Sequence, residues 1–168
     1  MTMNSLHELL VHELRDLYGA EQQLSKALPK MAKASTSEAL AKAFLDHLED
    51  TDRHVTRLKE SLTLLGETPS PVKCKGMEGL LKEGTEMMEE EGNELVRDAG
   101  LIGAAQRVEH YEVAAYGTSI ELASVLGEDR VVALLRKTLD EEKAANQRLT
   151  EIAERDVNPK AMLSSVAA

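Results

Sequence analysis

Apolar residues recur every three or four positions through four long stretches of the chain, which is the spacing of one buried face of an α-helix. The first stretch follows Asn4 and Ser5, either of which can cap a helix. Its apolar positions are Leu6, Leu10, Leu14, Leu17, Leu24, Leu28 and Met31. The second follows Ser37 and ends at Gly66, and its stripe reads Phe44, Leu48, Thr51, Val55, Leu58, Leu62 and Leu65. Pro29 predicts a kink or a boundary in the first helix.

The second half of the chain has the same organisation. A third helix is predicted from about Asp98 to Gly127, and a fourth from about Glu128 to the pair Asn158-Pro159. Because proline lacks a backbone N–H, we expect the helix to stop there and residues 156–168 to form a tail. Residues 66–98 connect the two halves, and the helical composition from Met77 to Glu91 predicts a short helix within this connection.

These elements predict an all-α, ferritin-like four-helix bundle of two antiparallel hairpins, with a long crossover that contains a short helix. A short turn inside each pair makes its helices antiparallel neighbours. A connection as long as 66–98 can carry the chain back along the bundle before the third helix starts. The alternative is an up-down-up-down bundle with the connection as a surface excursion. A length of 168 residues fits a single domain, 1–168.

Composition limits the binding partners and the cellular compartment that we expect for this protein. Only 2% of the residues are aromatic, which favours helices over sheets, and 30 acidic against 20 basic residues give a net charge of −10. This charge argues against nucleic acid and favours cations. The single cysteine, Cys74, fits a reducing compartment, and residues 1–14 do not resemble a signal peptide. We therefore expect a cytoplasmic protein without a membrane segment.

Acidic residues interrupt the apolar stripe of every long helix. A carboxylate buried without a partner costs several kcal/mol or takes up a proton, so a group of them at one depth indicates a bound cation. Counted from the turn at Ser35 or the turn at Gly127, the central carboxylates lie 14 or 15 residues away, or about 21–23 Å along the helices. The predicted metal ligands are Glu21, Glu49, Asp52, Glu109, Glu112 and Glu142.

The ligand spacing differs from the known di-iron or di-manganese pattern, which uses Glu-x-x-His on two helices. Glu142 is followed three residues later by Ala145, and His47, His54 and His110 are predicted to lie beside the stripes rather than on them. An all-carboxylate site would suit manganese, magnesium or calcium as readily as iron. The same residues could instead be solvated or paired with Arg107 or Lys143.

Five segments spread over nearly the whole chain carry a family resemblance: His12–Tyr18, Ala27–Ala32, Lys73–Gly79, Val108–Gly117 and Asp140–Ala144. In these segments the chain resembles the YciE/YciF family of bacterial stress-associated proteins. The resemblance implies a four-helix bundle related to rubrerythrin and ferritin, a homodimer and a link to stress responses. It implies no particular biochemical activity.

Two functions follow from these patterns. The first is a non-haem metal protein that uses iron or manganese for iron oxidation, peroxide handling or sequestration. The alternative is a metal-free structural or interaction protein that acts as a homodimer. A storage cage is a third possibility. The sequence contains no hydrolase triad, phosphate-binding loop or dinucleotide fingerprint, so an enzymatic role would rest on the carboxylates alone.

Overall fold

The computed structural model describes residues 3–166, and all of its regular elements are helices. The four long helices are α1 (Leu6–Ala34), α2 (Glu38–Leu64), α4 (Glu94–Val125) and α5 (Asp129–Ile152). The crossover contains α3 (Lys75–Glu89). A π-helical turn (Ala153–Val157) joins α5 to the C-terminal α6 (Asn158–Val166). None of these helices combines the length and the apolar character that crossing a membrane requires.

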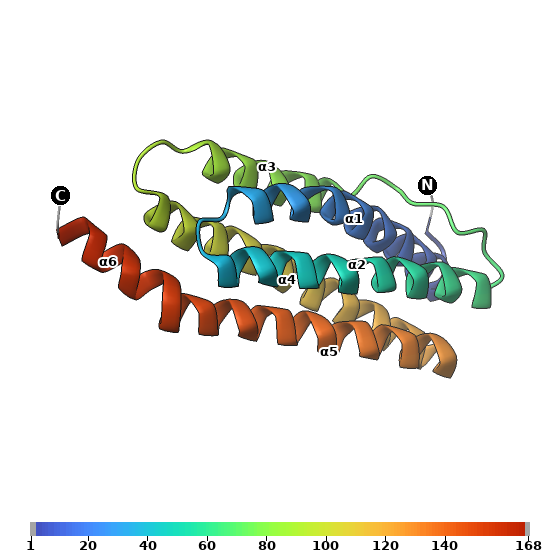
Figure 1. Cartoon of the computed structure of the whole chain (residues 1–168). Coiled ribbons are helices and arrows are strands. Elements are labelled where there is room, and N and C mark those ends of the chain that lie inside the picture. Colours follow the sequence, from blue (N-terminus) through green and yellow to red (C-terminus); the bar gives the residue numbers. More distant parts are fainter. Residues whose placement is uncertain (1–2, 167–168) are drawn as a thin grey trace.

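The long helices form the ferritin-like topology. The α1–α2 turn and the α4–α5 turn lie at opposite ends of the bundle, and α2 and α4 run in the same direction (Figure 1). Helix α3 carries the chain back in the opposite direction and packs against α1 and α4 (Figure 1). The predicted arrangement of two hairpins and a long crossover is therefore confirmed, and the up-down-up-down alternative is excluded.

Polar caps define the N-terminal ends of α1 and α2. The hydroxyl of Ser5 accepts the N–H of Glu8, and that of Ser37 accepts the N–H of Leu40. Asp98 from α4 also accepts the N–H groups of Thr36 and Ser37, at 3.0 and 2.7 Å. This carboxylate lies at the N-terminal, positive end of α2, which favours its negative charge. Its hydrogen bonds link the first turn to α4 of the second hairpin.

Three sequence predictions need correction. Helix α1 has no boundary at Pro29, because it continues to Ala34. Helix α4 begins before Asp98, because the side chain of Asn93 accepts the N–H groups of Leu95 and Val96. The predicted tail is helical as far as Val166: Pro159 cannot bond the carbonyl four residues back, and the preceding wide turn instead joins the N–H of Asn158 to the carbonyl of Ala153. Residues 167–168 of the predicted tail lie outside the described residues.

The apolar core is divided into two clusters along the bundle. One cluster, near the α1–α2 turn, includes Leu28, Phe44 and Leu101. The other, near the α4–α5 turn, includes Leu14 and Leu135. Between them lies a layer of buried polar side chains, described below.

The segment before α3 lies tightly against α1. The N–H of Val72 bonds the carbonyl of Arg15, and the side-chain amide of Gln23 bonds both the N–H and the carbonyl of Cys74. This approach requires glycine at position 19, because a Cβ there would lie 1.7 Å from the carbonyl oxygen of Val72. We call residues 67–74 the strap.

Replacing Gly19 with alanine should therefore destabilise the protein although alanine favours helices. We expect Gly19→Ala to lower the free energy of unfolding by about 1–3 kcal/mol, the usual cost of overpacking. Gly79→Ala is the matched control, because a Cβ at this exposed helical glycine meets nothing within 4 Å. It should raise stability by about 0.5–1 kcal/mol. Chemical denaturation followed by circular dichroism measures both, and equal effects would show that the strap does not press on α1.

Candidate metal centre

Six ionisable side chains from the four long helices meet in the layer between the two apolar clusters. They are Glu21 from α1, His47 and His54 from α2, Glu109 and Glu112 from α4, and Glu142 from α5. None is more than 7% exposed. Each pair on one helix is three or seven residues apart, so both members share its inner face. We call these six residues the central cluster.

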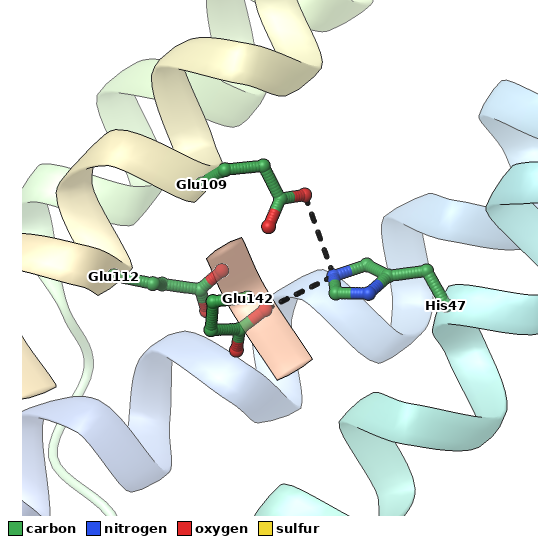
Figure 2. Close-up of side chains that lie close together, drawn as sticks. All are labelled: His47, Glu109, Glu112 and Glu142. Atoms are coloured by element: carbon green, nitrogen blue, oxygen red, sulfur yellow. Dashed lines mark ion pairs between the residues drawn. The ribbon is translucent and has the colours of Figure 1, made fainter. Parts of the chain in front are cut away.

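One half of the central cluster surrounds the imidazole of His47. Its Nε2 lies 3.4 Å from Oε1 of Glu109 and 3.6 Å from Oε2 of Glu142. Figure 2 shows the carboxylates of Glu109, Glu112 and Glu142 gathered on one side of this ring. One ligand atom from each of the four residues lies within 4.8 Å of the others, which is close enough for all four to hold a single ion.

The other half is formed by Glu21, His54 and Glu142. Nδ1 of His54 lies 2.9 Å from Oε1 of Glu142 and 3.3 Å from Oε1 of Glu21, and these ligand atoms also fall within 4.8 Å of one another. Glu142 belongs to both halves. The geometry therefore provides two adjacent cation positions with one carboxylate shared between them.

Residues around the central cluster hold its ligands in place. Nε2 of His54 lies 3.0 Å from Oε2 of Glu141, whose carboxylate is bound in turn by the guanidinium of Arg57. This leaves Nδ1 of His54 facing the cluster, and an imidazole oriented by an outer carboxylate is common at metal sites. The hydroxyl of Tyr116 donates a hydrogen bond to Oε1 of Glu21.

Burial dominates the electrostatics of these groups. It raises the pKa of Glu21 to about 7, because desolvation and the charge of Glu142 outweigh the hydrogen bond from His54. Burial and nearby carboxylates hold the pKa values of Glu109 and Glu112 well above the usual range. Desolvation opposes the charge of His54, but bonds to Glu142 and Glu21 raise its pKa to about 10. For His47 the effect of desolvation is larger than that of the charge on Glu142, so its pKa is lowered. The raised pKa values favour proton binding at Glu21, Glu109 and Glu112, and divalent cations could replace these protons.

The hydrogen-bonding capacity of the layer is left largely unused by the protein. Both carboxylate oxygens of the fully buried Glu112, and both ring nitrogens of His47, find no hydrogen-bond partner among the described residues. Buried polar atoms in native proteins are nearly always paired. Four carboxylates and two imidazoles are also the ligand set of di-iron and di-manganese bundles. The residues present therefore fit a pair of such ions.

The sequence predicted four of these six residues. Glu21, Glu109, Glu112 and Glu142 lie in the central cluster, at one depth in the bundle, as the spacing from the turns predicted. The predicted positions of Glu49 and Asp52 are wrong, because both side chains are exposed on the outside of α2. The role of the four buried carboxylates as metal ligands stays a prediction.

The two histidines were missed because the predicted stripe of α2 took Leu48 and Val55 in place of their neighbours His47 and His54, although Phe44, Thr51, Leu58 and Leu62 are buried as predicted. The buried face of α2 contains Leu40, Phe44, His47, Thr51, His54 and Leu58. The spacing of seven between the histidines, two full turns apart with Thr51 between them, was the available signal. His110 is exposed and lies outside the cluster.

Comparison with known proteins places this geometry in a family. The sequence profile of the family described as "Domain of unknown function (DUF892)" matches residues 5–162. The chain belongs to the DUF892 family. The resemblance to the YciE/YciF family, drawn from five sequence segments, is confirmed by this match and by the relatives reported below.

The chain is 43% identical over 162 residues to Protein YciF of Escherichia coli strain K12, covering 96% of this chain and 98% of that protein. The crystal structure of the E. coli stress protein YciF matches with a TM-score of 0.89 over 93% of this chain and 99% of that one. YcfI of Rhodopseudomonas palustris, 45% identical, matches with a TM-score of 0.85 over 88% and 94% of the two chains. A ferritin-like, diiron-carboxylate protein of Bacillus anthracis is 16% identical, covers 89% and 99%, and with a TM-score of 0.69 shows the ferritin-like fold alone.

The raised pKa values make the stability of the metal-free DUF892 protein depend on pH. A carboxyl group that binds its proton more tightly when folded stabilises the protein at low pH. This contribution is lost as pH rises, for Glu21 between about 4.5 and 7. His54 changes stability in the same direction between about 6.5 and 10. The melting temperature of chelator-treated protein should therefore fall from pH 5 to pH 8.

Glu112→Gln should make this fall shallower and raise the melting temperature at pH 8, because glutamine mimics a protonated carboxyl that cannot ionise. Glu49→Gln, at an exposed position of α2, is the control and should leave the pH profile unchanged. Differential scanning calorimetry on both variants measures the effect. Parallel profiles for wild type and Glu112→Gln would show that Glu112 does not hold a proton in the folded protein.

Proposed function

We propose that this DUF892 protein is a ferritin-like metal protein whose central cluster holds two iron or manganese ions. The observation that carries the proposal is Glu112, a fully buried carboxylate whose two oxygens have no donor among the described residues. Removing such a charge from water without compensation costs several kcal/mol. A bound cation compensates this cost, and it does so for the neighbouring carboxylates as well.

The ligand set favours iron or manganese over harder cations. Calcium and magnesium prefer oxygen ligands alone, whereas imidazole nitrogens favour transition metals. Each half of the central cluster supplies one histidine, and Glu142 is placed to bridge the halves. A pair of such ions would supply redox or Lewis-acid chemistry. The protein's own contribution is to orient His54 through Glu141, to hold Glu21 through Tyr116, and to exclude water with the two apolar clusters.

Because a relative of 43% identity is described as a stress protein, we place this function in the stress response of the cell. Iron or peroxide handling are the activities that fit both this context and the ligand set. A cytoplasmic location agrees with the single cysteine.

Metal binding should be visible as stabilisation by mass action. Titration of chelator-treated protein with Fe²⁺ under anaerobic conditions, or with Mn²⁺, should raise stability by about 2.7 kcal/mol when the free ion reaches 100 times its Kd. For a chain of this size that is about 5–10 °C in melting temperature. Elemental analysis of protein purified without chelators should find one or two equivalents per chain.

Glu112→Gln and Glu142→Gln should abolish this metal-dependent shift, whereas Glu49→Gln should retain it. Wild-type protein that contains no metal and is not stabilised by either ion would refute the proposal. That result would favour the alternative of a metal-free structural or interaction protein.

We also propose that the chain forms a homodimer through the outer face of α4. This helix carries apolar residues on both sides, and its outward stripe includes Val113, Ala114, Gly117, Leu122 and the 73% exposed Val125. A helix that is apolar all round is usually buried. A Cβ at Gly117 would meet nothing within 4 Å, so a second copy could approach closely here. A two-fold axis would bring the same stripe of both copies together.

Val125→Glu should shift the dimer toward monomer, because a two-fold interface brings the introduced charge into the contact on both copies. Leu45→Glu is the matched control: the residue is 50% exposed on α2 and the change in net charge is the same. Size-exclusion chromatography with light scattering measures the mass. A dimer that survives Val125→Glu and dissociates with Leu45→Glu would move the interface to α2.

A further inference from the structure

A cavity of about 170 Å³ lies between α2 and α5 and reaches the central cluster. His47 and Glu109, two of the cluster residues, form part of its lining. Small or apolar side chains form most of the rest: Ala43, Phe44, Ala144, Ala145 and Leu149. The cavity is therefore continuous with one of the two proposed ion positions.

The exposed fractions of the cluster residues identify the same side of the site. His47 is 7% exposed and Glu109 is 3% exposed, whereas Glu21, His54, Glu112 and Glu142 are completely buried. Within the part of the chain that the structure describes, solvent thus touches the cluster at the two residues that line this cavity.

Ala145 explains why there is space here. It lies three residues after Glu142, the position at which the Glu-x-x-His pattern places an imidazole. In this protein the second histidine comes from α2 instead, and the methyl group of Ala145 lines the cavity. A larger side chain at this position would extend into the space beside His47.

Charged residues line the solvent end of the cavity. Asp46 and Asp50 on α2, Glu141 on α5 and the guanidinium of Arg148 belong to its lining. Each of the three carboxylates is also paired with a cation on α2: Asp46 with Lys42, Asp50 with Arg53 and Glu141 with Arg57. Nη1 of Arg148 lies 2.7 Å from Oδ2 of Asp46, so an ion pair joins the two walls. Both side chains are partly exposed, at 44% and 36%, and a bridge of this kind is weak enough to open readily.

We propose that this cavity is the route by which a divalent cation reaches the central cluster, and that the Asp46–Arg148 ion pair retards its passage. The inference rests on the proposed metal-binding function. Opening of the Asp46–Arg148 pair moves a positive charge away from the solvent end of the cavity. The passage lined by Ala144 and Ala145 leads inward, and His47 and Glu109 would be the first ligands that the cation meets.

The experiment separates the rate of metal uptake from the amount bound. Chelator-treated protein is mixed with Co²⁺, a spectroscopic probe, in a stopped-flow instrument, and absorbance reports uptake. Elemental analysis after equilibration reports occupancy. Ala145→Leu should slow uptake at least about tenfold while leaving occupancy unchanged, because Ala145 supplies no ligand atom. Ala133→Leu is the control, an exposed alanine on the same helix.

Arg148→Gln should accelerate uptake at least about threefold, because it removes both the bridge and a repelling charge. Arg136→Gln makes the same change in net charge at an exposed position of α5 and should have a much smaller effect. If Ala145→Leu impairs folding, Ala144→Leu narrows the cavity from its exposed side and should slow uptake in the same way.

Uptake at the wild-type rate in both alanine variants, with full occupancy, would overturn the proposed route and leave the metal site intact. Wild-type protein that binds no Co²⁺, Fe²⁺ or Mn²⁺ at equilibrium would instead overturn the proposed function itself. The two failures are therefore distinguishable.

Discussion

The central physical constraint in this protein is the neutralisation of four carboxylates buried in the middle of a helical bundle. Glu21, Glu109, Glu112 and Glu142 are almost completely removed from water, and within residues 3–166 His54 is the only cationic side chain in contact with them. Ionised carboxylates cannot remain in such surroundings unpaired. Protons or cations must supply the missing positive charge, so the folding stability of this protein is coupled to pH and, under the proposed function, to metal binding.

The bundle compensates by building rigid apolar structure on both sides of the polar layer. The two apolar clusters fill the ends of the bundle, and the hairpins are fastened together by Asp98, which binds the N–H groups of the first turn. On the outside, the strap closes over α1 at Gly19. Rigid supports of this kind hold ligand side chains in position before any ion arrives, which reduces the entropy lost on binding.

This chain has the ferritin-like scaffold but places the candidate ligands differently from the di-iron pattern. Both imidazoles come from α2 and are seven residues apart. The position three residues after Glu142, where the Glu-x-x-His pattern has a histidine, is Ala145. The number of carboxylates and imidazoles is the same as in di-iron bundles. Moving one imidazole to a neighbouring helix conserves the ligand set, and it opens a cavity beside His47 that a closed site would lack.

The sequence by itself determined the helices, the turns and the depth of the acidic layer, because helical periodicity and capping are local properties that a spacing of residues records. Ser5, Ser37 and Glu112 were placed correctly in this way. The tertiary structure decided which face of α2 points inward: His47 is buried and Glu49, two residues and about 200° further around the helix, is exposed. It also decided that Pro159 lies within a helix and that Asp98 contacts the first turn, because both depend on packing between segments far apart in the sequence.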